Sequence, residues 1–229
     1  MSDLTVCPAC GGGSFSHQKI LWPGLIEEWR LSPEEADYID QQQGTHCISC
    51  HNNLRAMVLA RAICRALDRP EPLAEAVQTA ATSLQILEIN QSGHLTPYLR
   101  RMSGYQFAAY PEVDMMNMSY ESGMWDLVVH SDTLEHVADP VRALQECRRI
   151  LKSTGRCCFT VPVIVGRTTR QRTELPPSYH GGAGDERSDY LVHTEFGADM
   201  WCWPIRSGFS RVEIDTIAFP AGLALTCRP

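Results

Sequence analysis

Residues 125–163 read WDLVVHSDTLEHVADPVRALQECRRILKSTGRCCFTVPV and decide the fold. The apolar runs WDLVVH (125–130) and GRCCFTVPV (155–163) have the length of buried strands, and DPVRALQECRRIL (139–151) between them is typical of a helix. Asp139 and Pro140 suit the start of that helix, because Asp caps helix N-termini and Pro fits the first helical position. A strand, a helix and a further strand in this order predict an α/β fold with a parallel sheet.

The flanking segments extend this pattern in both directions. SLQILEI (83–89) predicts a buried strand, and a polar, Gly-containing turn and a helix at 94–102 follow it. YQFAAY (105–110) is a further strand candidate. The tail at 208–229 holds two apolar segments separated by a Pro- and Gly-containing turn, which indicates a hairpin. We therefore expect a Rossmann-like, doubly wound sheet that is mostly parallel, with an antiparallel hairpin at its C-terminal end.

The chain divides by composition into three regions. Residues 1–52 lack a continuous hydrophobic periodicity and are interrupted by Gly and Pro. We therefore expect a small module that needs a cross-link to stabilise its fold. Residues 53–72 predict a connecting helix that ends at a Pro-rich stop, and residues 73–229 predict the main domain. Within that domain the polar stretch 165–196 predicts a long loop, and loops of this length in compact domains usually serve function.

Two CxxC motifs lie in the first region, and their thiols belong to Cys7, Cys10, Cys47 and Cys50. Each motif presents two thiolates from one tight turn, and two such turns together make a tetrahedral sulfur site that suits zinc. Four protein ligands leave no open position for water, so the site should be structural rather than catalytic. The alternatives are iron, a neighbouring His46 or His51 as a ligand, and four ordinary reduced cysteines.

Bulk composition narrows the classes of function. The 229 residues carry a formal net charge of −7, which argues against a surface built to bind nucleic-acid phosphates and favours a small-molecule partner. The polar start Ser2-Asp3-Leu4-Thr5 has no signal-peptide pattern, and no apolar run reaches the roughly 20 residues of a membrane span. We expect a cytoplasmic protein without a membrane partner, and its oligomeric state stays open.

Three segments, in order, are similar to the motifs of class I S-adenosylmethionine-dependent methyltransferases. They are LEINQSG (87–93), DMMNMSYESGMWD (114–126), and DLVVHSDTLEHVADP (126–140) with ILKSTGR (150–156). The resemblance covers about a third of the chain and implies an enzyme that binds S-adenosylmethionine. The N-terminal module resembles zinc-binding regions that precede methyltransferase domains in enzymes acting on sugars or other secondary metabolites, which is an analogy of architecture.

The resemblance also implies site residues. Those that it assigns to the cofactor are Glu88, Asn90, Ser92, Gly93, Asp114, Met115, His130 and Ser131. Asp114 would accept from the adenine amino group, and the Met115 amide would serve the adenine ring. The chain departs from the family pattern at Asn90, where a glycine is expected, and it lacks a clear acid for the ribose hydroxyls, for which only Tyr110 and Glu112 are available.

Methyl transfer requires an aligned acceptor and, where the acceptor carries a proton, a base. His136 follows the WDLVVH strand and is a candidate base, although it could instead pack the start of the helix. In the long loop, His180 is a second catalytic candidate, and Tyr179, His180 and Glu195 are candidate substrate contacts. The leading hypothesis is methylation of a small molecule. A degenerate scaffold protein and an enzyme that methylates RNA or protein are the competing hypotheses.

Overall fold

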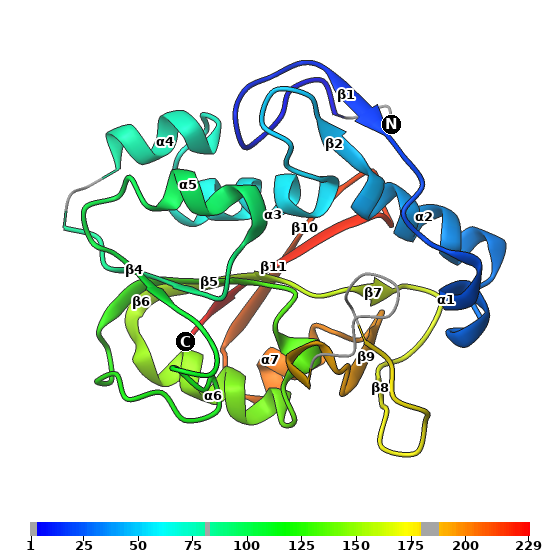
Figure 1. Ribbon diagram of the computed structural model, residues 1–229. Coiled ribbons are helices and arrows are strands. Elements are labelled where there is room, and N and C mark those ends of the chain that lie inside the picture. Colours follow the sequence, from blue (N-terminus) through cyan, green and yellow to red (C-terminus); the bar gives the residue numbers. More distant parts are fainter. Residues whose placement is uncertain (1–3, 81–82, 180–187) are drawn as a thin grey trace.

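A mixed sheet forms the centre of the molecule in the computed structural model, which describes residues 4–80, 83–179 and 188–229 (Figure 1). Within these residues the sheet has six strands, in the order β10-β11-β6-β5-β3-β4. The strands are β3 (Ile86–Ile89), β4 (Tyr105–Ala108), β5 (Trp125–Ser131), β6 (Leu151–Thr160), β10 (Arg211–Ile217) and β11 (Gly222–Arg228). β3 pairs in parallel with β4 and β5, and β5 with β6, whereas β11 is antiparallel to β6 and β10. The predicted mostly parallel sheet with a C-terminal hairpin is confirmed.

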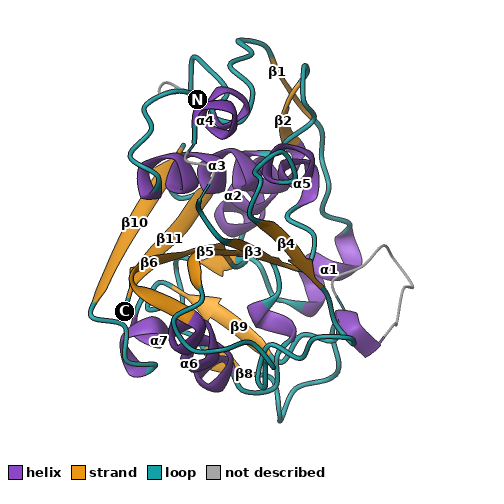
Figure 2. Ribbon diagram, turned by 90° about the vertical axis from the view of Figure 1, so that its left-hand side faces the viewer, coloured by secondary structure: helices purple, strands orange, loops and turns teal. Residues whose placement is uncertain are grey.

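Helices cover both faces of this sheet, as a doubly wound fold requires (Figures 1 and 2). One face carries α3 (Leu54–Ala66), α4 (Leu73–Thr79) and α5 (Thr96–Leu99), and the other carries α6 (Pro140–Ile150) and α7 (Cys202–Arg206). The start of α6 has the predicted chemistry, because the Asp139 side chain accepts a hydrogen bond of 3.0 Å from the amide of Arg142 and Pro140 follows it. The segment around 125–163 thus folds as its sequence indicates.

Helix α3 connects the two regions and also belongs to an apolar core that they share. Its N-terminus is capped by Asn53, whose side chain accepts from the amide of Ala56, and its apolar face is buried against the sheet. Arg65 on its other side forms an ion pair with Asp215 of β10. Buried residues of the N-terminal region, among them Cys7 and Cys47, belong to the same apolar core as α3. The packing therefore continues across the boundaries expected at residues 52 and 72.

The N-terminal region is built around a small hairpin and two helices. β1 (Phe15–His17) pairs antiparallel with β2 (Thr45–Cys47), and the chain between them forms α1 (Pro23–Glu28) and α2 (Pro33–Gly44). A capping box fixes the start of α2, because the Ser32 hydroxyl accepts from the amide of Glu35 while the Glu35 carboxylate accepts from the amide of Ser32. These helices lie beside the sheet rather than on one of its two faces (Figure 1).

The stretch predicted as a long loop is partly regular in the structure. Three short strands, β7 (Val163–Ile164), β8 (Arg170–Gln171) and β9 (Thr194–Gly197), form a second sheet in the order β7-β9-β8. Two of them have only two residues, which is too short for an alternating pattern to reveal them. Arg167 joins this sheet to α2 through an ion pair of 2.8 Å with Glu35. Among the described residues, no helix combines the length and apolar character needed to cross a membrane.

Candidate active site and cysteine centre

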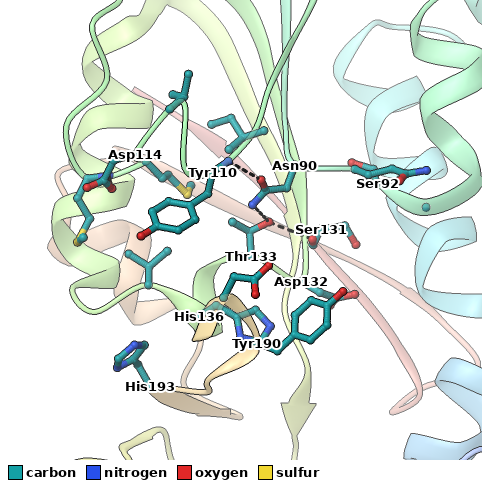
Figure 3. A pocket seen from close by; sticks show the side chains of 18 of the residues that line it. Asn90, Ser92, Tyr110, Asp114, Ser131, Asp132, Thr133, His136, Tyr190 and His193 are labelled. Atoms are coloured by element: carbon teal, nitrogen blue, oxygen red, sulfur yellow. Dashed lines mark hydrogen bonds between the residues drawn. The ribbon is translucent and has the colours of Figure 1, made fainter. Parts of the chain in front are cut away.

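The main cavity opens at the carboxyl ends of the parallel strands. From β3 the chain proceeds to β4 on one side of the sheet, and from β5 to β6 on the other, so neighbouring β3 and β5 mark the point where the strand order reverses. The cavity at this point, called here the strand-end cavity, has a volume of about 760 Å³. The polar and charged side chains that line it include Asn90, Ser92, Tyr110, Asp114, Ser131, Asp132, Thr133, His136, Tyr190 and His193 (Figure 3).

The turn after β3 takes the shape that a glycine would give it. Asn90 has a φ of +57°, in the left-handed region that Asn tolerates better than most residues, and Gly93 has a φ of +59°. The Asn90 side chain accepts a hydrogen bond of 3.1 Å from the amide of Tyr110 and donates one of 3.4 Å to Thr133 Oγ1 (Figure 3). Asn90 therefore preserves the backbone path of the turn and also joins the ends of β3, β4 and β5.

Glu88 lies outside the lining of the strand-end cavity and supports the turn instead. Its side chain is buried, and one carboxylate oxygen accepts hydrogen bonds from the amide of Ser92 at 2.8 Å and from Thr96 Oγ1 at 2.7 Å. The second oxygen accepts from the Tyr105 hydroxyl at 2.5 Å. These donors hold the Glu88 carboxylate toward the protein interior, and its contact with the cofactor stays a prediction.

The opposite side of the cavity is formed by the segment after β4. Asp114 and Met115 both line it, as expected from the motif resemblance. One oxygen of Asp114 accepts a hydrogen bond of 2.8 Å from the amide of Met116, which fixes the carboxylate in the turn. Of the two candidates for the ribose hydroxyls, Tyr110 lines the cavity, whereas Glu112 is exposed to solvent outside the lining.

Asp132 stands at the end of β5 and was passed over in the sequence analysis. Its φ of +45° is unusual for a residue other than glycine, and such strain is common at functional positions. Its Oδ2 lies 2.5 Å from a guanidinium nitrogen of Arg55, while its Oδ1 has no hydrogen-bond partner within the described part of the chain. Burial raises the pKa of Asp132 to about 7, an effect that Arg55 opposes and Glu135 reinforces. The feature of the sequence that could have identified Asp132 is its position as an acidic residue directly after the buried strand β5.

Ser131 and His136 also line the strand-end cavity. The Ser131 hydroxyl is held by a 2.8 Å hydrogen bond with Thr160 Oγ1 on β6. His136 Nδ1 lies 3.0 Å from the carbonyl oxygen of Leu191, so this nitrogen carries a proton and donates it to the carbonyl. Nε2 lies 3.7 Å from Oε1 of the buried Glu135. The ring is thus positioned from both sides, and its role as a base stays a prediction.

His130, the remaining residue assigned to the cofactor, is packed in the core on the α6 side of the sheet. It is fully buried and stacks on Phe159, with 4.6 Å between the ring centroids. Its ring nitrogens lie close to the thiols of Cys147 and Cys157, again within the core. Burial lowers the pKa of His130 to about 3. The side chain therefore packs as a neutral apolar ring, because alternation along β5 points it away from the cavity.

Acid should destabilise the fold through His130. An unfolded histidine titrates at about 6.5, whereas burial lowers the pKa of His130 to about 3, so between these values the unfolded chain binds a proton that the folded chain rejects. The stability is lost as the pH falls from about 6.5 toward 3, by on the order of 1 kcal/mol per pH unit. His130→Phe should reduce this loss, and urea unfolding at pH 7 and pH 4.5 measures it. Equal acid losses in both proteins would contradict the buried neutral ring.

The two candidates in the long loop that the structure describes, Tyr179 and Glu195, lie in different environments. Tyr179 lines a second cavity beside α1 and α2, away from β4 and the segment that follows it. His180 lies outside the described residues. Glu195 lies outside the linings of both cavities, because its buried carboxylate forms ion pairs with Arg170 at 2.5 Å and with Arg172. Glu195 therefore joins β9 to β8 and the segment after it through these ion pairs, and its role as a substrate contact stays a prediction.

The four cysteines of the CxxC motifs come together at the N-terminal hairpin. Their sulfur atoms all lie within 4.8 Å of one another, and the Cys7–Cys50 and Cys10–Cys47 pairs are separated by 3.7 and 3.6 Å. Four sulfurs placed 2.3 Å from a tetrahedral ion are about 3.8 Å apart, so the spacing fits a metal. The amide of Gly12 donates to Cys10 Sγ and the Asn52 side chain donates to Cys50 Sγ, as expected around thiolates.

Comparisons with known proteins find a curated relative and several similar solved structures. A curated relative, an uncharacterized 37.1 kDa protein in a transposon of Streptomyces fradiae, is 29% identical over 136 residues, which cover 57% of this chain and 39% of the relative. The chain thus spans well under half the length of that relative. A SAM-dependent methyltransferase from Thermotoga maritima is similar in structure, with 15% identity, a TM-score of 0.42, and coverage of 68% of this chain and 87% of that one.

A second solved structure, an S-adenosylmethionine-dependent methyltransferase from Mesorhizobium loti, has 14% identity and a TM-score of 0.41 over 64% of this chain and 91% of that one. Residues 71–159 match the sequence family described as the methyltransferase domain. That segment runs from α4 to the end of β6 and contains the turns after β3 and β5 that line the strand-end cavity. This segment, less than half of the chain, is therefore similar to the methyltransferase domain family.

Proposed function

We propose that this protein transfers a methyl group from S-adenosylmethionine to a small-molecule acceptor. The observation that supports this most strongly is the strand-end cavity, which lies where the strand order reverses and is lined by three of the turns that the family motifs specify. A volume of about 760 Å³ falls within the range of cofactor-sized pockets. The family match and the cavity therefore point to the same end of the sheet.

The residues present fit the cofactor. The turn at 90–93 lines the cavity, and the small residues Ser92 and Gly93 bring its backbone close to the space that the cofactor would occupy. Asp114 and Met115 would hold the adenine, and the Tyr110 ring lies on the same side of the cavity (Figure 3). When bound, S-adenosylmethionine supplies an electrophilic methyl group on a sulfonium sulfur, which retains the bonding electron pair after transfer.

The chain's own contribution is then to hold an acceptor in line and to take its proton. Asp132 has the chemistry for the second task, since its Oδ1 has no hydrogen-bond partner among the described residues and its pKa of about 7 lets the carboxylate accept a proton near neutral pH. Arg55 holds the other oxygen and fixes the carboxylate at the cavity edge. His136 is the second candidate for this role.

The scaffold hypothesis rested on Asn90 and the missing ribose acid. Because Asn90 adopts the left-handed conformation of the missing glycine, the turn keeps its path, and this supports an active enzyme over a degenerate one. A screen of candidate metabolites with methyl-labelled S-adenosylmethionine tests the function. We expect a product that carries the label and whose mass exceeds that of the acceptor by one labelled methyl group in place of one hydrogen. Labelling of bulk RNA or protein alone would overturn the small-molecule proposal.

The second part of the proposal is a structural zinc ion at the four cysteines. Support comes from the sulfur spacing, from the donors to Cys10 and Cys50, and from the absence of a fifth metal-binding side chain in the cluster as described. Cys7 and Cys47 are fully buried in the core shared with α3. A metal at this place would therefore stabilise the N-terminal region against the helix that also carries Arg55.

A further inference from the structure

A second cavity of about 310 Å³ lies between the N-terminal region and the segment that follows β6, and we call it the N-terminal cavity. Most of its lining is apolar and includes two tryptophans. The apolar lining residues are Ile20, Leu21, Trp22, Leu25, Trp29, Leu31, Ile39, Pro162, Val163 and Ile164. The remaining lining residues are Gln42, Gln43, Arg55, Asp132, Glu135 and Tyr179.

The two cavities meet at one ion pair. Arg55 and Asp132 line both the strand-end cavity and the N-terminal cavity. Because Asp132 stands between them, a ligand in the N-terminal cavity would present its nearest atom to the carboxylate that also borders the cofactor site. The two cavities are therefore placed so that a cofactor in one and an acceptor in the other would have the Asp132 carboxylate between them.

The polar atoms around the N-terminal cavity are mostly bound to other parts of the protein. The Gln42 side chain donates a hydrogen bond of 2.7 Å to the carbonyl of Ala221, and Gln43 Oε1 accepts one of 2.9 Å from Arg55. Trp29 Nε1 donates to Ser178 Oγ at 2.8 Å. The apolar residues that form most of the lining offer no partners to the many hydroxyls of a sugar, and burying such hydroxyls without partners would be unfavourable.

We propose that the N-terminal cavity binds the methyl acceptor, and that this acceptor is a small aromatic compound with a phenol-type hydroxyl directed at Asp132. This inference rests on the proposed function and adds the substrate class to it. The volume lies at the lower end of ligand pockets, which limits the acceptor to about one or two rings. Tryptophan walls favour a flat ring by stacking, and the apolar lining disfavours a charged one.

In this arrangement the proton and the electrons balance. The acceptor oxygen would lose its proton to Asp132 and form a bond to the methyl carbon, while the carbon–sulfur bond of S-adenosylmethionine would break and leave its electron pair on the sulfur of S-adenosylhomocysteine. Asp132 would later release the proton to water. Asp132 begins this step as a carboxylate, whose Oδ2 is paired with Arg55 and whose buried Oδ1 has no hydrogen-bond partner among the described residues. No oxidant or further reactant is required.

The test uses 2-naphthol and glucose as probes on the metal-loaded protein. Leu25→Trp fills the N-terminal cavity, and Ile205→Trp is the matched control, because Ile205 is 44% exposed on α7 outside both cavity linings. We expect 2-naphthol to bind the unchanged protein and the control, and to lose at least tenfold in affinity with Leu25→Trp. The affinity for S-adenosylhomocysteine should stay the same in all three, and glucose should not bind.

A measurement on the unchanged protein tests the same inference without a substitution that could prevent folding. With 5-fluorotryptophan incorporated at the five tryptophans, 2-naphthol should shift the fluorine signals of Trp22 and Trp29 and leave that of Trp201 unchanged. Cofactor-product binding without any shift at Trp22 or Trp29, or glucose competing at these signals, would overturn the acceptor inference while the proposed function stands. Loss of cofactor-product binding by the folded protein would overturn the proposed function itself.

Discussion

Replacing Asp132 with Asn should lower the rate of methyl transfer by about a hundredfold to ten-thousandfold, the range associated with loss of a general base. The amide keeps the size of the side chain but cannot take a proton. Binding of S-adenosylhomocysteine should change little, because the substitution leaves the lining of the turns after β3 and β4 intact. Steady-state kinetics with an identified acceptor, together with a binding titration, measures both quantities.

Asp126→Asn is the matched control for that variant. Asp126 lies at the opposite end of β5, where it pairs with Lys152 at 2.7 Å and accepts from the amide of Gln85. Its loss should lower stability modestly and leave turnover within about twofold, as is usual for a partly exposed ion pair. If Asp132→Asn turned over as fast as Asp126→Asn, Asp132 would not be the base.

The pH profile separates Asp132 from His136. Burial raises the pKa of Asp132 to about 7, so turnover should rise about tenfold per pH unit below 7 and level off above it. Arg55 and Glu135 face Asp132 from neighbouring elements, and His136 lines the same cavity. In Asp132→Asn the break near pH 7 should disappear, whereas in His136→Gln it should remain. A break that disappears only with His136 would transfer the role of base to that residue.

Replacing Cys47 with Ser should remove the metal and lower the free energy of unfolding by several kcal/mol, since structural zinc sites contribute directly to folding. Cys47 is fully buried in the core that α3 shares with the N-terminal region, so the loss should extend beyond the hairpin. Zinc analysis by mass spectrometry should fall from one ion per chain to nearly none, and thermal unfolding should shift to lower temperature.

Cys202→Ser provides the comparison for Cys47→Ser. Cys202 is a half-buried cysteine on α7, outside the cysteine cluster, so its replacement should leave metal content and unfolding temperature close to those of the unchanged protein. A Cys47→Ser protein that keeps its metal and its stability but loses turnover would contradict a structural role for the four cysteines.

The sequence predicted the parts of the fold that local patterns encode. The strands and helix within 125–163, the capping Asp139 and the C-terminal hairpin follow from apolar runs and cap chemistry, and the structure contains all of them. The spacing of the CxxC motifs likewise predicted four sulfurs at one place. The short strands β7 and β8 were not predictable, because two residues carry no period and their pairing depends on distant partners.

For the candidate site, too, the sequence predicted some residues and missed others. Asn90, Asp114 and Ser131 were placed by motif order, and they line the strand-end cavity. The carboxylates of Glu88 and Glu195 lie in the protein interior, where hydrogen-bond donors hold that of Glu88 and arginines hold that of Glu195. The sequence does not reveal these contacts. Asp132 and the N-terminal cavity depend on α3 and α1 meeting β5 in space. These contacts join residues more than 75 positions apart in the chain, as the Arg55–Asp132 pair illustrates.

A calorimetric titration of the folded, metal-loaded protein with S-adenosylhomocysteine tests the central claim most directly. We expect saturable binding of one molecule per chain. Replacing Gly93 with Val should clearly lower this affinity, because a branched side chain is strained at a φ of +59° and would occupy the cavity edge. Absence of binding by the unchanged protein, with its fold and metal content intact, would contradict the central claim.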